Sequence, residues 1–226
     1  RPPPATRLDV AAAAACLGLL IPFYFLSRAV LPSLGLYPHT WEKAGLADAA
    51  KILAGQWGRA ATALTLHADA AHLLGTVVVG SLFGAVLAAE IGLGTGLACM
   101  VAAGALGNLF NAVAHGGEHL SLGFSTAVFG GAGAIAGLRA LAGPFSGLRA
   151  GLVPIGAGLG LLAMLGSEGE RTDLGAHVFG FVAGLVLGLL AARLTRRFGP
   201  PGPLLNVACG LTALAAPLLA WWLALR

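Results

Sequence analysis

Gly123-Phe124-Ser125-Thr126-Ala127-Val128-Phe129-Gly130 opens an apolar run that continues to Leu138. Glycine at positions 123, 130, 131 and 133 removes side-chain bulk, which lets the backbones of neighbouring membrane helices approach closely. A polar connection, residues 115–121, precedes the run. We therefore expect Ser125 to lie one or two turns inside a membrane-embedded helix, where its hydroxyl either bonds to its own backbone or takes part in chemistry.

The composition predicts a polytopic membrane protein. Of the 226 residues, 58% are hydrophobic and only 10% are charged, whereas a soluble domain carries about a quarter charged residues. The three cysteines, Cys16, Cys99 and Cys209, lie far apart in apolar runs and predict no disulfide framework. The net charge of +4 comes from clustered loop arginines, so no nucleic-acid partner is expected.

Seven apolar segments each approach the ~20 residues that a bilayer core requires. They cover residues 8–30, 67–89, 93–114, 122–141, 148–166, 174–194 and 204–225. The first could be a signal peptide, because Arg7 precedes an alanine run, but its length and the later spans favour a membrane helix. Residues 1–7 are basic and proline-rich, and we expect them to be disordered. The connection 31–66 carries Trp41 and Trp57, which suit the membrane–water boundary.

The short loops predict the orientation, because Lys and Arg favour the cytoplasmic side. The basic residues that gather on the side of the N-terminus are Arg139, Arg149, Arg193, Arg196 and Arg197. We therefore expect an integral protein of a bacterial inner (cell) membrane with a cytoplasmic N-terminus. Ser125 then lies near the external face, and Trp221-Trp222 places the C-terminus outside.

Three histidines are expected at the depth of Ser125: His67 and His72 near the start of the second span, and His177 near the start of the sixth. Ionisable groups are costly in a membrane, so they are functional candidates. One such histidine often only packs, but three of them level with one serine favour a site.

Gly180 and Gly184 form a ridge of small residues beside His177. This ridge would let the sixth span press against the glycines of the fourth, with His177 within hydrogen-bond reach of Ser125. A serine hydroxyl is a poor nucleophile until an adjacent base takes its proton. The alternative is that both ridges serve packing alone.

Four short blocks follow one another between roughly residues 50 and 195. They are Gly55-Gln56-Trp57-Gly58-Arg59, the set His67, His72 and Thr76, Gly123-Phe124-Ser125-Thr126, and Ala176-His177-Val178-Phe179-Gly180. These blocks resemble the Trp-Arg loop, HxxxxHxxxN, GxSG and AHxxG motifs of the rhomboid intramembrane serine proteases. The chain departs from the family pattern where Gly58 is inserted, where Thr76 replaces asparagine, and where Thr126 replaces glycine.

The resemblance implies an all-α polytopic membrane protein. The expected protein has a rhomboid-like core of six helices over residues 8–195. A linker and one extra C-terminal transmembrane helix are expected over residues 196–226. It implies a Ser125–His177 dyad with no obligatory acid, and an oxyanion site formed by the Ser125 backbone N–H, His72 and Thr76. In the family an aromatic ring stacks on the catalytic imidazole at the position of Phe129; a core aromatic is the alternative. His67 and Gly123 would line the site.

The implied function is hydrolysis of peptide bonds in membrane-anchored proteins near the external membrane face. The expected partners are transmembrane protein substrates and the lipid bilayer, with no cofactor; the oligomeric state is not predicted. The alternative is a catalytically inactive rhomboid-like protein that binds membrane clients. Intact Ser125 and His177 favour the enzyme, while Thr76 and Thr126 favour the inactive protein.

Two patterns suggest metal sites, and we expect neither to bind a metal. His67 and His72, with Asp69 between them, are five residues apart, which is ~140° around a helix. Residues 115–119 fit the zinc motif H-x-x-E-H, but that motif works on a helix and here contains two glycines. Asp173, four residues before His177, could orient the imidazole, but we expect it to cap the sixth span.

Overall fold

The structure is a computed structural model that describes residues 4–142 and 173–226. Its helices are α1 (Arg7–Gly18), α2 (Leu20–Arg28), α3 (Pro38–Gly45), α4 (Ala49–Leu53), α5 (Arg59–Thr62), α6 (Ala70–Ile91), α7 (Leu93–His115), α8 (Ser125–Ala142), α10 (Leu174–Phe198) and α11 (Pro203–Ala224), with 3-10 turns η1 (Pro32–Leu34) and η2 (Ala63–Thr65). Two short strands, β1 (Ala47–Asp48) and β2 (Leu120–Ser121), pair antiparallel. The predicted span 148–166 lies outside the described residues.

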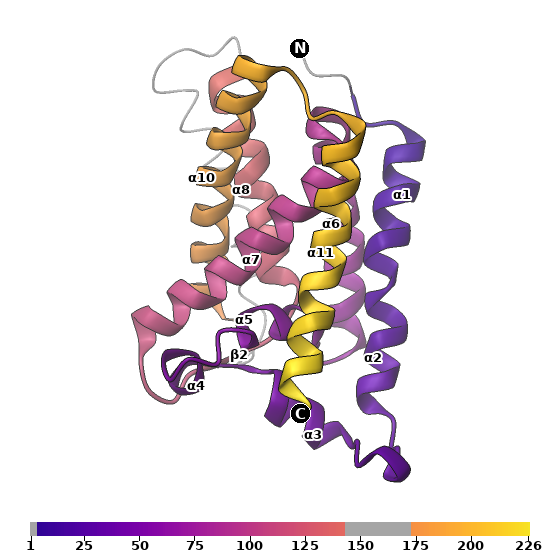
Figure 1. The fold of residues 1–226 in the computed structure, drawn as a ribbon, viewed down its shortest axis with the longest axis vertical. Helices are drawn as coiled ribbons and strands as arrows, with labels where there is room; N and C mark the ends of the chain where they lie inside the picture. The colour runs from indigo at the N-terminus through magenta and orange to yellow at the C-terminus, as the bar shows by residue number, and fades with distance from the viewer. Residues whose placement is uncertain (1–3, 143–172) are drawn as a thin grey trace.

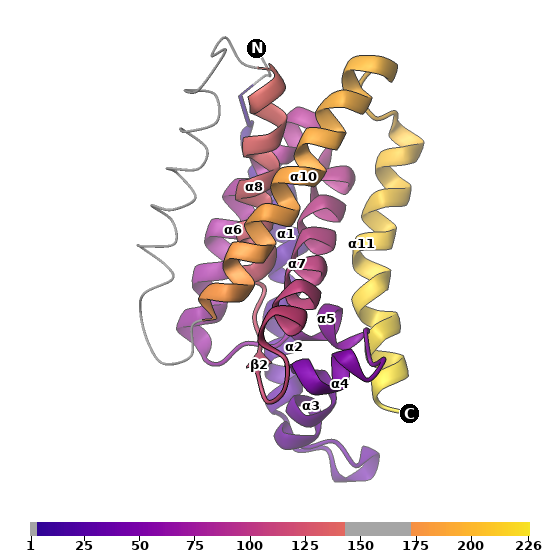
Figure 2. The same ribbon diagram turned by 90° about the vertical axis from the view of Figure 1, so that its left-hand side faces the viewer.

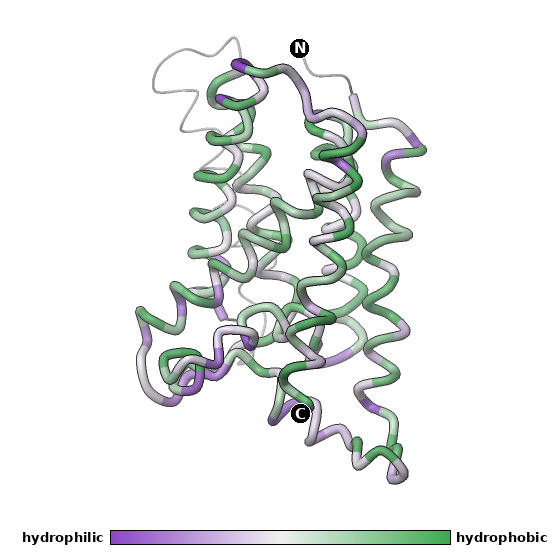
Figure 3. The backbone as a smooth tube through the Cα atoms, viewed as in Figure 1, coloured by the Kyte–Doolittle hydropathy of each residue, from purple (hydrophilic) through white to green (hydrophobic). Residues whose placement is uncertain are grey.

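The predicted all-α polytopic class is confirmed. Within the described residues, five helical segments are long and apolar enough to cross a membrane: α1 with α2, α6, α7, α10 and α11. The helix α8 is apolar but shorter. Hydrophobic residues follow the length of these helices, while hydrophilic residues gather towards the two ends of the molecule (Figure 3).

The helices that carry the predicted site pack directly against one another. α8 lies against α10, and α7 contacts both, while α1 packs on α6 and α11 packs on α7 and α5 (Figures 1 and 2). α11 ends at the same end of the molecule as α3, opposite to the end at which α1 begins (Figure 1).

The contact between α8 and α10 depends on glycine. A Cβ atom placed on Gly184 would lie 2.7 Å from the carbonyl carbon of Gly130, and one placed on Gly133 would lie 2.8 Å from the backbone nitrogen of Leu185. Both distances are shorter than ordinary contacts, so any side chain at these positions would push the helices apart. The predicted close approach of the fourth and sixth spans is therefore confirmed.

Three of the long apolar helical segments begin at polar caps. Thr6 and Asp9 form a reciprocal capping box at α1, where each side chain binds the backbone N–H of the other residue. Asp69 accepts a hydrogen bond from the His72 N–H at 2.8 Å and starts α6, so His67 precedes the helix although the prediction placed it within the span. Asp173 starts α10.

The fourth span also begins later than predicted. Ser125 is the first residue of α8, not a residue one or two turns inside it. The reason lies at Gly123, whose φ of +118° belongs to a region that L side chains rarely adopt and that no helix contains. The chain therefore turns at Gly123, and the helix starts two residues later.

The connection between α2 and α6 folds into short helices held by Arg59. This buried guanidinium donates from Nε to Gln56 Oε1 at 2.7 Å, and from its other nitrogens to the carbonyls of Leu46 at 3.1 Å and Lys43 at 3.0 Å. Trp57 is 71% exposed, as a residue at the membrane boundary can be. Trp41 is buried instead.

Candidate active site

Ser125 and His177 meet at the α8–α10 contact. The Nε2 atom of His177 lies 2.8 Å from the Oγ atom of Ser125, within normal hydrogen-bond distance. Ser125 is the first residue of α8 and His177 stands in the first turn of α10, with only 4% of its surface exposed. Two rigid helix starts thus place a base against a hydroxyl.

The opposite edge of the His177 ring has no hydrogen bond to an acid within the part of the chain that the structure describes. Among the described residues, its Nδ1 atom has no hydrogen-bond partner. The ring instead stacks on Phe129, with centroids 4.3 Å apart and planes inclined by 22°. Asp173 accepts a hydrogen bond from the Ala176 N–H at 3.0 Å, so its predicted role as the cap of this helix is confirmed.

Gly123 keeps a space open between His72 and Ser125. A Cβ atom at position 123 would lie 2.6 Å from His72 Cε1, 2.8 Å from His72 Nε2 and 3.2 Å from Ser125 Oγ. An oxygen atom in this space is therefore within reach of both the imidazole and the hydroxyl. The N–H groups in the first turn of a helix have no intrahelical partner, and Ser125 begins such a turn.

His67 and Thr76 form a pair beside this space. The Nε2 atom of His67 lies 3.1 Å from the Thr76 hydroxyl oxygen and 3.4 Å from the Phe124 nitrogen, while Nδ1 lies 3.3 Å from the Thr65 carbonyl oxygen. Donation from Nδ1 to that carbonyl leaves Nε2 as an acceptor. His67 thereby connects α6 to the residue that precedes Ser125.

The single hydroxyl proton of Thr76 already has acceptors in this arrangement. Besides His67 Nε2, the carbonyl oxygens of His72 and Leu73 lie 3.0 and 2.9 Å from Thr76 Oγ1. The hydroxyl is buried. The structure thus brings His72 to the space beside Ser125, but directs Thr76 towards His67 and its own helix.

Thr126 lies inside the helix contact and fits there. It is only 1% exposed, and its methyl carbon would lie 2.8 Å from a Cβ atom at Gly107 and 3.0 Å from one at Gly180. Because these two residues have no side chain, the methyl group fills the space that they leave. The departure from the family pattern at this position is compensated by glycine on α7 and α10.

A polar cluster beside the site was not predicted. Asp173 Oδ2 accepts from Asn111 Nδ2 at 2.6 Å and lies 2.7 Å from His119 Nε2. Burial alone would raise the pKa of the Asp173 carboxyl, but hydrogen bonds from the Ala176 N–H, His119 and Ser121 hold that pKa below its ordinary value. The cluster ties α7 and the loop before Ser125 to the start of α10. The polar residue Asn111 within an apolar span was the signal that could have predicted this cluster.

The two metal patterns do not form sites in the part of the chain that the structure describes, where no three His, Cys, Asp or Glu side chains gather as ligands. Gly116 and Gly117 have φ of +57° and +67° and end α7 inside the H-x-x-E-H segment. His115 and His119 stack with centroids 4.0 Å apart, and His115 Nδ1 lies 3.1 Å from the Asn111 carbonyl oxygen.

Comparison with protein families adds one finding. A family model described as the Rhomboid domain matches residues 54–194, a range that contains Ser125, His177, His67 and His72. A search of curated proteins found no match.

Proposed function

Because the chain belongs to the rhomboid family, we propose that it is an intramembrane serine endopeptidase that cleaves membrane-anchored proteins with a Ser125–His177 dyad. The observation that carries this proposal is the 2.8 Å separation of His177 Nε2 and Ser125 Oγ. A base at this distance can take the serine proton as the oxygen attacks a carbonyl carbon. The helix starts around both residues are fixed by packing, so the pair needs little rearrangement.

The negative charge of the tetrahedral intermediate would be held in the space that Gly123 leaves open. His72 Nε2 faces that space, and the Ser125 N–H at the start of α8 is the second donor. We assign Thr76 an indirect role: its hydroxyl holds His67, and His67 accepts the Phe124 N–H.

His177 would then complete the reaction. The protonated imidazole gives its proton to the leaving amine, and an acyl group remains on Ser125 Oγ. Water attacks the acyl carbon while His177 takes a proton from it, and His177 then gives that proton to Ser125 Oγ as the acyl–oxygen bond breaks and the carboxyl product leaves. The stacked ring of Phe129 favours the imidazolium, because an aromatic face attracts a cation.

The charge asymmetry of the loops supports an active site that opens to the external face, with the N-terminus in the cytoplasm. Substrates would be transmembrane proteins that are cut near their external ends. Impermeant cysteine labelling on intact cells tests this orientation. Reagent should reach a cysteine introduced at Gly116 and not one introduced at Gly199, and the reverse pattern would contradict it.

A cleavage assay tests the activity itself. Wild-type protein and the Ser125→Ala variant are reconstituted in liposomes with a generic transmembrane substrate. We expect cleavage by wild type and only background cleavage by the variant, because the other hydroxyl paired with an imidazole, that of Thr76, is directed towards His67 and its own helix. Substantial cleavage by Ser125→Ala would contradict the proposal, and loss of wild-type activity on chelation would point to a metal enzyme.

The second candidate is a family member that binds membrane clients without cutting them. The position of the Thr76 hydroxyl favours it, because that group faces His67 and supplies no free donor to the oxyanion space. Loss of one oxyanion donor typically costs ~10²–10³ in rate. A wild-type protein that cleaves nothing but retains membrane proteins through purification, equally with and without Ser125, would support this candidate.

A further inference from the structure

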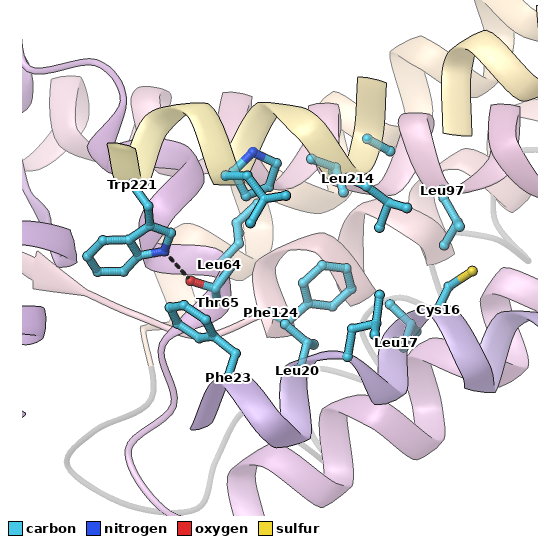
Figure 4. A pocket seen from close by; sticks show the side chains of 15 residues that line it. Cys16, Leu17, Leu20, Phe23, Leu64, Thr65, Leu97, Phe124, Leu214 and Trp221 are labelled. Carbon is cyan, nitrogen blue, oxygen red and sulfur yellow. Dashed lines mark hydrogen bonds between the residues drawn. The ribbon is translucent and has the colours of Figure 1, made fainter. Parts of the chain in front are cut away.

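An apolar cavity of about 260 Å³ lies between the N-terminal helices and α11, and its lining includes neither Ser125 nor His177 (Figure 4). Its walls come from α1, α2, η2, α7, the turn before α8, and α11. The inner wall includes Leu64 and Phe124, both at most 5% exposed, and Phe124 directly precedes Ser125. The outer rim includes Leu19 and Leu218, which are 55% and 66% exposed. The cavity therefore extends from the surface of two membrane-spanning segments to the vicinity of the active site.

The lining favours an apolar ligand. Among the described residues, none that lines the cavity is charged, and the hydroxyl of Thr65 is occupied on both sides. It accepts from Trp221 Nε1 at 2.8 Å (Figure 4). It also donates to the Thr62 carbonyl at 2.7 Å. A ligand here finds no free hydrogen-bond partner on the side chains of Thr65 and Trp221, and most of the other lining side chains are hydrocarbon, so the cavity favours an apolar group.

The size suits a slender apolar group. An apolar cavity of about 150 Å³ already binds benzene, so a cavity of about 260 Å³ has room for a run of methylene groups.

An aromatic cluster forms part of the cavity wall. Trp221 lies 5.6 Å from Phe23 and 5.0 Å from Trp41, measured between ring centroids, and these rings join the end of α11 to α2 and α3. Because Trp221 and Phe23 line the cavity, a chain bound there would lie beside Trp221.

From the position, lining and size of this cavity, we propose that it binds a single acyl chain of a membrane lipid. The rim opens on the lipid-facing surface of α2 and α11, where acyl chains are the surrounding solvent. A chain that is already in the bilayer is not transferred out of water, so it gains only the contacts of better packing. We therefore expect the acyl chain to bind at this one position and to exchange with other lipids of the bilayer.

Fluorescence quenching tests the proposal without reference to activity. In a background where Trp41, Trp57 and Trp222 are replaced by phenylalanine, Trp221 is the only tryptophan. The protein is reconstituted in phosphatidylcholine with brominated or unbrominated acyl chains. Trp221 is only 5% exposed, so we expect at least twofold quenching because a brominated chain occupies the cavity beside it.

The cavity-filling variant Ala213→Leu should at least halve that quenching, because it adds an isopropyl group to the α11 wall. Ala215→Leu is the matched control: the same change on the exposed side of the same helix should leave the quenching unchanged. Val101→Phe fills the cavity from α7 and serves if Ala213→Leu does not fold. Native mass spectrometry should find one lipid retained by wild type and by Ala215→Leu, and none by the filled variants. Equal quenching and equal lipid retention in all variants would overturn the proposal, because surface lipids alone would then explain the signal.

Discussion

Replacing Gly184 by alanine should increase the distance between Ser125 and His177, although neither of these residues is changed. A Cβ atom at this position would lie 2.7 Å from the carbonyl carbon of Gly130, whereas ordinary contacts begin at 3.4 Å, so α8 and α10 must move apart by at least 0.7 Å. If the shift reaches the site, the 2.8 Å bond between Ser125 and His177 lengthens to about 3.5 Å, beyond the ~3.2 Å that proton transfer requires. A misplacement of about 1 Å can cost ~10² in rate. We therefore expect kcat/KM to fall by roughly 10- to 100-fold.

The assay compares cleavage of one transmembrane substrate in liposomes by wild type, Gly184→Ala and Gly75→Ala. Gly75 also lies inside a helix, but a Cβ atom there has nothing within 4 Å, so Gly75→Ala should retain wild-type activity. Overpacking typically costs ~1–3 kcal/mol of stability, so the thermal midpoint of each variant is measured beside its rate. Full activity in a folded Gly184→Ala would refute the claim that this helix contact sets the geometry of the dyad.

Three further substitutions test other parts of the site. Gly123→Ala should lower the cleavage rate by ~10² or more, because the new methyl group would occupy the space beside His72 and strain a backbone with φ of +118°; unchanged activity would exclude this space as the oxyanion site. Thr126→Gly should keep cleavage within about tenfold of wild type, or ~1.4 kcal/mol in barrier, but lower the melting temperature because it leaves a void against Gly180; an inert wild type that gains activity would show that the threonine is a block. Asp173→Ala should lower the free energy of unfolding by ~0.5–2 kcal/mol, because α10 loses its cap. The pKa of the Asp173 carboxyl is lower in the folded protein than in the unfolded chain. Its contribution to stability is therefore fully present above the ordinary pKa of about 3.9, and it is lost as the pH falls through the pKa of the folded protein. The difference in melting temperature from wild type should therefore narrow below about pH 4, and a difference that persists there would contradict the assignment.

The sequence predicts the class of the protein and the pairing of Ser125 with His177. The charge deficit and the apolar spans predict a polytopic membrane protein, since nothing else explains runs of this length. Glycines spaced along two spans predict their close approach, because that property depends only on missing side chains. The pairing of Ser125 with His177 came from the resemblance together with those ridges.

Other features depend on contacts between distant segments and cannot be read from local patterns. The start of α8 at Ser125 is set by the backbone angle of Gly123, which a sequence pattern does not give. The tolerance of Thr126 depends on Gly107, which lies on another helix. The cavity is lined by residues from segments that are far apart in the chain, among them Cys16, Val101 and Trp221. Each of these is decided by the packing of helices that are far apart in the chain.

Covalent labelling of Ser125 tests the central claim most directly. Wild type, Ser125→Ala and His177→Ala are treated in liposomes with a fluorophosphonate probe that reacts only with activated serines, and the modified residue is identified by mass spectrometry. The account predicts one label on Ser125 in wild type and loss of that label in both variants, because the hydroxyl is reactive only beside its base. Absence of labelling in wild type, or equal labelling in His177→Ala, would contradict a Ser125–His177 dyad.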